Sequence, residues 1–219
     1  MDLSSVKYDF YAWRKINSED KELDGISSLV TIVKGLFRKD RLLAVMKDFV
    51  YFPDSSDKDI KIVCRYPQFF AANKLFENIK THMRPDGDGK GGTYFGATGC
   101  GKSYTMLFLT RMLMKSPHFH SPTIWLLRYR TDLDDQLSKQ FIASKKYIGD
   151  ETVVSIESRD KLREELAKAE KAVVYIWQLS RKFTEDIQLL TDRANVTVSR
   201  RSTQKPDQPW PESSHHRMQ

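Results

Sequence analysis

Apolar residues recur at helical spacing in the first part of the chain. Between Gly25 and Phe49 they form two stripes, which predict two short helices. The stripe residues are Leu29, Ile32, Val33 and Leu36 in the first helix and Leu42, Leu43 and Met46 in the second. Alternation over residues 60–64 predicts a short strand, and Pro67 suits the first turn of a further helix. We therefore expect residues 1–60 to form a small helical and linker region.

After residue 92 the chain alternates between short apolar runs and helical patterns. Strands are predicted over residues 93–95, 123–127, 152–156, 172–177 and 194–198, and helices over 102–114, 131–141, 160–169 and 183–191. Strands that alternate with helices indicate a parallel sheet with crossover connections. The strand runs are apolar on both faces, as a sheet covered by helices requires. The expected fold class is α/β, with residues 61–196 as the main domain.

A glycine-rich loop separates the first predicted strand from the helix that follows it. It matches the pattern G-x-x-x-x-G-K-[ST] at every fixed position, through Gly96, Ala97, Thr98, Gly99, Cys100, Gly101, Lys102 and Ser103. Glycines let successive backbone N–H groups turn toward phosphate oxygens, and the helix N-terminus adds its positive end. Lys102 would reach the terminal phosphates of ATP, and the Ser103 hydroxyl would hold Mg²⁺. The plainer alternative is a glycine-rich turn with a surface lysine.

Composition narrows the class of protein without selecting a function. Apolar residues make up 40% of the 219 residues, which is enough to fill a core. Lys and Arg outnumber Asp and Glu by 36 to 29, a net charge of +7 that permits a nucleic-acid partner without requiring one. Cys64 and Cys100 are too few and too far apart for a disulfide scaffold or a zinc site, which favours a cytoplasmic protein. No secretion signal is recognised, and no apolar stretch approaches the roughly 20 residues of a membrane span.

Several segments around the loop resemble the motor subunits of type I restriction enzymes. The resemblance runs from about residue 29 to residue 196. It is carried by Asp88–Gly92, Ser103–Met106, Arg130–Leu137 and Lys182–Asp186. Arg65–Lys74 also resembles the family's adenine-recognition segment, in which Gln68 would read the base of ATP. Without the resemblance, Gln68 would be interpreted as an ordinary exposed helix residue.

The resemblance implies a superfamily 2 motor built from RecA-like domains. Such a subunit uses ATP to pull double-stranded DNA past the complex, cuts it with a separate nuclease domain, and works with methylation and specificity subunits. By the same resemblance, Arg130 and Thr131 would contact DNA phosphates, whereas the aspartates that follow them would only supply charge at a helix start. Two alternatives stay open. One is a different P-loop helicase or ATPase, and the other is a non-catalytic module that binds nucleotide to shape an interface.

The sequence departs from this family where a second acidic motif is expected. A P-loop ATPase needs an Asp–Glu pair after a strand, which helps to hold Mg²⁺ and orients the attacking water. Here the predicted strand 194–198 runs into Ser199–Pro206, which lacks that pair. One choice of codons for residues 198–209, read one base later, encodes Ser-Arg-Asp-Glu-Ala-His-Arg-Ser-Gln. We therefore hypothesise a shift of reading frame near residues 196–198, which the gene sequence tests.

This hypothesis makes residues 197–219 an out-of-frame tail, and its scarcity of apolar residues predicts disorder. The motor domain would then be incomplete, and no nuclease motif is recognised in the first 60 residues. We expect the chain by itself to bind nucleotide weakly and to hydrolyse it negligibly. An exposed sheet edge would also lower its solubility.

Overall fold

The computed structural model describes residues 13–21, 27–54, 60–97, 99–120, 122–128, 134–149, 153–156, 158, 160–161, 164, 173–178 and 195–200. The N-terminal region contains two helices and a short hairpin. Helix α1 spans Ser27–Gly35 and helix α2 spans Lys39–Asp48, so the two predicted helices are confirmed. Strand β1, Val50–Tyr51, pairs antiparallel with strand β2, Ile62–Val63. Helix α3 then runs over Tyr66–His82, with a proline in its first turn.

The second half of the chain is built around a parallel sheet. The helices are α4 Lys102–Lys115, the short 3-10 helix η2 Pro117–Phe119, α5 Asp134–Ile142 and α6 Lys145–Ile148. The strands are β3 Thr123–Arg128, β4 Val153–Ile156, β5 Val173–Gln178 and β6 Asn195–Arg200. Their order in the sheet is β4-β5-β3-β6, and every neighbouring pair is parallel. This arrangement confirms the mixed α/β class.

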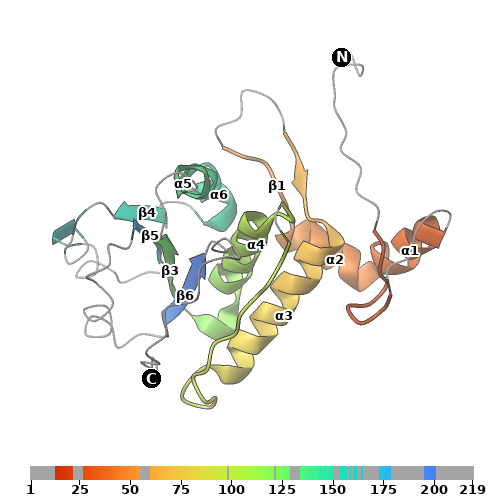
Figure 1. Ribbon diagram of the computed structural model, residues 1–219, viewed down its shortest axis with the longest axis horizontal. Coiled ribbons are helices and arrows are strands. Elements are labelled where there is room, and N and C mark those ends of the chain that lie inside the picture. Colours follow the sequence, from red (N-terminus) through yellow and green to blue (C-terminus); the bar gives the residue numbers. More distant parts are fainter. Residues whose placement is uncertain are drawn as a thin grey trace, which may run out of the picture.

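The elements lie in a row from the N-terminal helices to the sheet. Figure 1 shows α1 at the end of the molecule away from the sheet, with α3 and α4 between them. Helices α5 and α6 lie near the sheet, on the side of β4 and β5 in this view. Among the described helices, none is both long and apolar enough to cross a bilayer.

Some sequence predictions differ from the structure or lie beyond it. Residues 93–95 do not form a strand, and Phe95 is 81% exposed. Strand β6 continues through Arg200, so the boundary predicted between residues 196 and 197 falls inside a strand and the predicted disorder begins too early. The helix expected over 131–141 is described only from Asp134, and the helix at 160–169 only at residues 160, 161 and 164. The helix at 183–191 lies outside the described residues.

One aromatic core joins the N-terminal region to the two long helices. Phe49 lies between Phe69 of α3, with ring centroids 4.9 Å apart, and Phe108 of α4, at 5.3 Å. Trp13 is only 4% exposed, and its ring lies 5.9 Å from that of Phe69. Aromatic pairs at such distances add to the free energy already gained from burial. The core therefore contains residues from both sides of the boundary predicted between residues 60 and 61.

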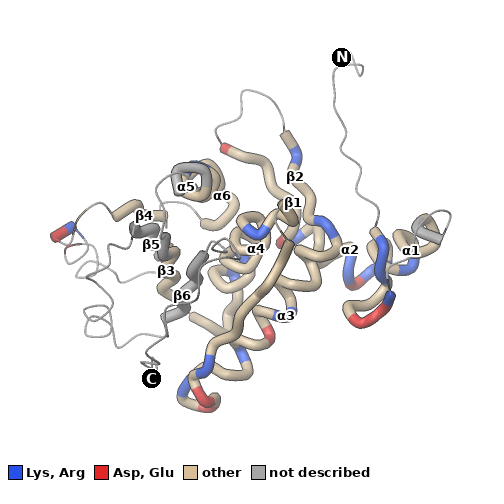
Figure 2. Tube along the Cα trace, viewed as in Figure 1, with Lys and Arg blue, Asp and Glu red and all other residues tan. Residues whose placement is uncertain are grey.

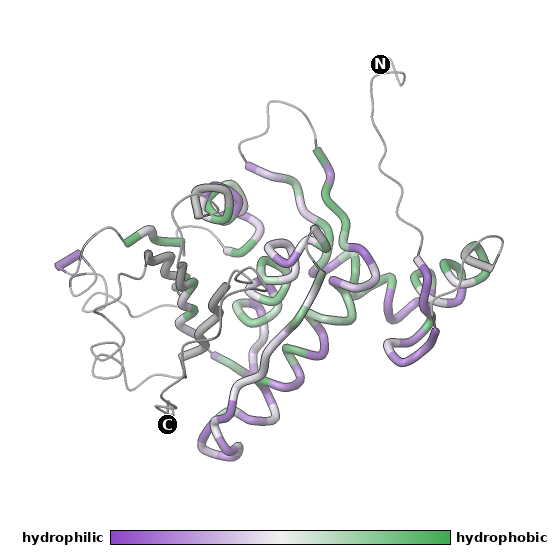
Figure 3. Tube along the Cα trace, in the orientation of Figure 1, coloured by the Kyte–Doolittle hydropathy of each residue, from purple (hydrophilic) through white to green (hydrophobic). Residues whose placement is uncertain are grey.

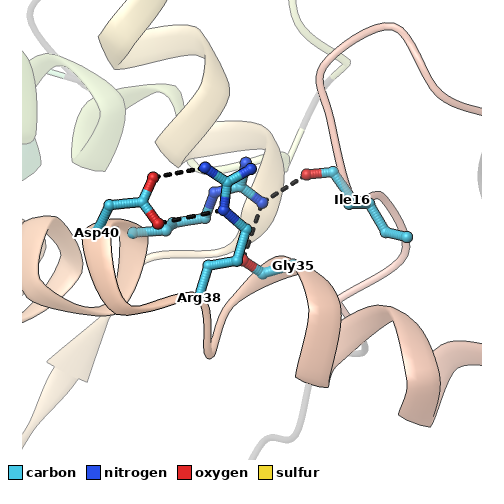
Figure 4. Close-up of polar contacts among 5 residues, drawn as sticks. Ile16, Gly35, Arg38 and Asp40 are labelled. Atoms are coloured by element: carbon cyan, nitrogen blue, oxygen red, sulfur yellow. Dashed lines mark hydrogen bonds and ion pairs between the residues drawn. The ribbon is translucent and has the colours of Figure 1, made fainter.

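Arg41 fastens the N-terminal segment to the helices that follow. Its guanidinium donates to the backbone carbonyls of Ile16, at 2.5 Å, and Gly35, at 2.9 Å (Figure 4). Because Gly35 is the last residue of α1, this bond satisfies a carbonyl that has no partner within the helix. Nearby, Arg38 and Asp40 form an exposed ion pair with two N–O distances of 2.7 and 3.1 Å. Exposed pairs of that kind contribute little stability.

Candidate phosphate-binding site

The glycine-rich loop forms the turn that leads into α4. Gly99 and Gly101 have φ angles of +77° and +79°, in the left-handed region that side chains disfavour. The Cys100 N–H bonds to the Ala97 carbonyl at 3.2 Å and closes the turn. A Cβ on Gly96 would lie 2.8 Å from Cys100 Sγ, which is too close. The two fixed glycines of the pattern, Gly96 and Gly101, and the additional Gly99 are therefore required by packing or by backbone conformation.

Lys102 begins α4, and its side chain turns back over the loop. The ammonium donates to the carbonyls of Gly96, at 2.8 Å, and Ala97, at 2.9 Å. The helix has no side-chain cap and no acidic residue in its first turn, so no carboxylate of that turn offsets its positive end. An ammonium group, a helix N-terminus and a glycine-rich backbone together make an arrangement suited to an anion such as a phosphate.

Gln68 connects α3 to this loop through both ends of its side-chain amide. Its Oε1 accepts from the Arg65 N–H at 2.8 Å, and its Nε2 donates to the Gly101 carbonyl at 3.3 Å. The residue is 4% exposed, so the alternative of an ordinary exposed helix residue is wrong. A Cβ on Gly101 would lie only 2.2 Å from Nε2. Gln68 and the loop are therefore in direct contact although they are distant in sequence.

The segment before the loop folds back on the end of α3. His82 Nδ1 and Asp88 Oδ1 lie 2.7 Å apart, and the same oxygen accepts the Lys90 N–H at 3.0 Å. The Gly89 N–H donates to the His82 carbonyl at 2.8 Å. The Lys90 N–H, and then His82, hold the pKa of the Asp88 carboxyl below its usual value. This turn fixes the path by which the chain approaches the phosphate loop.

Tyr94 lies against the loop and was not singled out by sequence reasoning, which treated it as a strand residue. A Cβ on Gly96 would lie 3.1 Å from the Tyr94 hydroxyl, so the phenol and the loop backbone are close. Burial raises the pKa of Tyr94, and the neighbouring Cys100 thiol raises it further. The phenol therefore stays neutral near the position where a negatively charged ligand would bind.

A polar cluster connects α4 to α2 and α6, and no sequence pattern pointed to it. Arg111 of α4 lies with Nε 3.7 Å from Asp48 Oδ1 of α2, and its guanidinium carbon lies 4.9 Å from the centroid of the Tyr147 ring of α6. Arg111 also donates to the Tyr147 carbonyl, and the Tyr147 hydroxyl donates to the Asp48 carbonyl. Burial raises the pKa of Asp48. The cluster ties the helix that carries Lys102 to two other helices.

The predicted DNA and metal residues are only partly visible. Thr98, Arg130 and Thr131 lie outside the described residues, whereas Ser103 is described as the second residue of α4. In the described part of the chain, no group of three or more His, Cys, Asp or Glu residues could hold a metal ion. In the register of the sheet, Arg200 at the end of β6 pairs with Arg128 at the end of β3. The position where an acidic motif was expected is thus basic.

Comparison with known proteins identifies the family to which the chain is related. A family model described as SWI2/SNF2 ATPase matches residues 67–203, which is more than half of the chain. The chain is 30% identical over 206 residues to the type I restriction enzyme HindI endonuclease subunit of Haemophilus influenzae, covering 90% of this chain. It is 29% identical over 212 residues to the putative MjaIXP endonuclease subunit of Methanocaldococcus jannaschii, covering 86% of this chain.

The similarity covers a limited part of those relatives. The chain spans 19% of the length of each of these two subunits, and 14% of the putative MjaVIIP endonuclease subunit of M. jannaschii, to which it is 30% identical over 165 residues. The resemblance to the motor subunits is confirmed by these matches. The chain belongs to the SWI2/SNF2 ATPase family and corresponds to the ATPase portion of type I restriction endonuclease subunits.

Proposed function

We propose that this chain binds the triphosphate of ATP in the loop 96–103 and forms part of the first RecA-like domain of a DNA-translocating restriction subunit. The observation that carries the proposal is the meeting of Lys102 and Gln68 at one loop. Lys102 places its ammonium group over the loop, and Gln68 donates a hydrogen bond to the carbonyl of Gly101, the last glycine of the loop. Gly99 and Gly101 supply the left-handed conformations that let a loop wrap phosphates. Ser103, next to Lys102, would provide the hydroxyl for Mg²⁺.

A binding assay with a fluorescent, non-hydrolysable ATP analogue tests this proposal. Lys102→Ala should weaken binding by about tenfold to a hundredfold, because a charge-assisted contact to phosphate contributes roughly 1.5–3 kcal/mol. The matched control is Lys115→Ala, which removes a lysine at the opposite, exposed end of the same helix. Equal affinities of the two variants and the unmodified chain would show that the loop does not bind nucleotide.

This chain should hydrolyse ATP negligibly even though it binds the nucleotide. The strand that would present the Asp–Glu pair ends in Ser199–Arg200, so no carboxylate of that motif orients the water or supports Mg²⁺. This position favours a second candidate function, a module that binds nucleotide without turnover. Phosphate release measured with and without double-stranded DNA separates the two candidates. Strong DNA-stimulated release would contradict the proposed loss of turnover and, with it, the proposed frame shift.

The DNA track is proposed to lie near Arg130 and Thr131. In sequence, both residues fall between the end of β3 at Arg128 and the start of α5 at Asp134, outside the described residues. The overall excess of basic residues agrees with a phosphate-contacting surface. Arg130→Gln should weaken binding of duplex DNA and reduce the dependence of affinity on salt by about one phosphate contact. An unchanged salt dependence would show that Arg130 does not contact a DNA phosphate.

The partners are proposed from the relatives and concern a longer protein than this chain. In a complete restriction subunit, the ATPase portion would work beside a nuclease domain and with methylation and specificity subunits. Co-purification of this chain with the methylation subunit encoded by the same genome tests the assembly. A chain that elutes free of it under low-salt conditions would restrict the proposal to nucleotide and DNA.

A further inference from the structure

The N-terminal helices α1 and α2, and the connection between them, turn large apolar side chains toward solvent. Six of them are between 50% and 68% exposed: Leu29, Val30, Val33, Phe37, Leu43 and Met46. We call these residues the α1–α2 face. Figure 3 shows hydrophobic positions along α1, at the end of the molecule away from the sheet. Leu29, Val30 and Val33 lie within about one turn of α1, and Leu43 and Met46 lie about one turn apart on α2, so each helix presents an exposed apolar strip of the kind that marks interaction sites.

Each of the two helices also turns a buried side chain toward the protein. On α1, Thr31 is 1% exposed and faces the protein, while Leu29 and Val33, one helical turn apart, lie on the outer side. On α2, Val45 is 3% exposed and faces the core, while Leu43 and Met46 lie on the outer side. In α1, Thr31 is therefore buried while Leu29, Val30 and Val33 are exposed, and Ile32 is the apolar residue of the helix that packs against the core. A helix that serves only its own core would show the reverse pattern.

The α1–α2 face is held rigidly to the body of the protein. Arg41 bonds to the carbonyl that ends α1 and to the N-terminal segment, as Figure 4 shows for Gly35 and Ile16. A Cβ on Gly35 would lie 2.7 Å from Trp13 Nε1, so the end of α1 is packed closely against that buried ring. The apolar side chains are consequently presented in a fixed arrangement, which lowers the entropy lost when a partner binds.

Charge decides which kind of partner fits this face. Residues 27–48 contain five basic and two acidic residues. Asp40 is paired with Arg38 and Asp48 with Arg111, so neither is available to a partner. Lys34, Lys39 and Lys47 are exposed and form no ion pair with any described residue, and Figure 2 shows basic positions along both helices. A second copy of this chain would bring like charges together, whereas an acidic partner would complement them.

We infer that the α1–α2 face docks an acidic amphipathic helix. Its apolar stripe covers the six exposed side chains, and carboxylates on its flanks meet the three lysines. The helix comes from the part of a full-length restriction endonuclease subunit that has no counterpart in this chain, because the chain spans only 19% of such relatives. This source rests on the proposed function, whereas the chemistry of the helix does not depend on nucleotide binding.

A pair of synthetic helical peptides tests the chemistry. Both carry the same leucine stripe, one flanked by glutamates and the other by lysines. Binding to the complete 219-residue chain is measured by isothermal titration calorimetry. The acidic peptide should bind at least about tenfold more tightly than the basic one, and Leu43→Ser with Met46→Ser should weaken it by about tenfold or more. Ile142→Ser, on α5, is the matched control, since that apolar residue is also partly exposed at 43%.

Overlapping peptides of about 20 residues, long enough for five helical turns, test the source. They cover the HindI endonuclease subunit, and the tightest binder should be acidic and lie outside the region aligned with this chain. Equal binding of the two synthetic peptides, or of the double variant and the control, overturns the docking surface. If light scattering shows a dimer that the double variant abolishes, the face binds a second copy of the chain. If the chain binds phosphatidylserine vesicles in preference to the acidic peptide, the face binds a membrane. Both outcomes overturn the inference. If Lys102→Ala does not change the affinity for the ATP analogue, the proposed function fails but the docking surface stands.

Discussion

Replacing Gly101 with alanine should destabilise the chain more than replacing Gly99, although the two glycines have nearly the same φ angle. An alanine in the left-handed region costs roughly 1–2 kcal/mol. At Gly99 that is the whole cost, since nothing lies within 4 Å of an added Cβ. At Gly101 the Cβ would lie 2.2 Å from Gln68 Nε2, so the buried amide must move. Displacing it leaves polar groups without partners, at a further cost of about 1–3 kcal/mol.

Urea unfolding followed by circular dichroism measures this difference. The free energy of unfolding should fall by about 1–2 kcal/mol for Gly99→Ala and by about 2–5 kcal/mol for Gly101→Ala, the sum of the strain and the lost hydrogen bonds. Unchanged denaturant slopes would show that both variants unfold from comparable native states. In a Gln68→Ala background, Gly101→Ala should cost no more than Gly99→Ala, because the obstructing amide is gone. Equal costs of the two alanines in the unmodified chain would refute the contact between Gln68 and the loop.

Three further outcomes follow from the buried groups around the site. Burial raises the pKa of the Cys64 thiol to about 12, so iodoacetamide should label Cys100 in the native chain but not Cys64. An ATP analogue bound at the loop should slow the labelling of Cys100. Mass spectrometry of the labelled chain measures both effects. Burial also raises the pKa of Tyr51 from 10.0 to about 12. Folded Tyr51 thus keeps a proton that the unfolded chain has released, and stability should fall as the pH rises from 10 to about 12, an effect that Tyr51→Phe removes in pH-dependent urea unfolding. Arg111→Ala should lower the free energy of unfolding by about 2–4 kcal/mol, because Asp48 is left as a largely buried, unpaired charge, and adding Asp48→Asn should recover part of the loss.

Helices and the phosphate loop could be predicted from sequence because their signals are local. The apolar periodicity of α1 and α2 lies within each helix, and Gly99 and Gly101 of the loop are fixed by left-handed conformations that each residue adopts by itself. The segment 93–95 shows the limit of this reasoning. Three alternating residues suggest a strand, but a strand forms only beside another, and no neighbour is paired with this segment in the described structure.

Contacts between distant segments were beyond local reasoning. Gln68 was proposed only through a family resemblance, and its bond to the Gly101 carbonyl depends on how α3 packs beside α4. The cluster of Arg111, Asp48 and Tyr147 draws on three helices, and no spacing pattern joins those residues in sequence. Periodicity also failed to say how the predicted stripe of α1 would divide, since Ile32 and Leu36 pack against the core while Leu29 and Val33 are exposed. Packing partners, which decide burial, are not encoded in a single helix.

The aromatic core sets a practical lower limit on any recombinant fragment of this ATPase portion. A fragment starting at residue 61, where sequence composition places the domain boundary, would lose Trp13 and Phe49. The rings of Phe69 and Phe108 would then face solvent. Such a fragment would be expected to aggregate during expression, even though it retains every residue of the phosphate loop. Expression trials should therefore begin upstream of Trp13, and nucleotide-binding measurements on shorter pieces would test a protein whose helix α4 has lost the Phe49 ring that packs on Phe108.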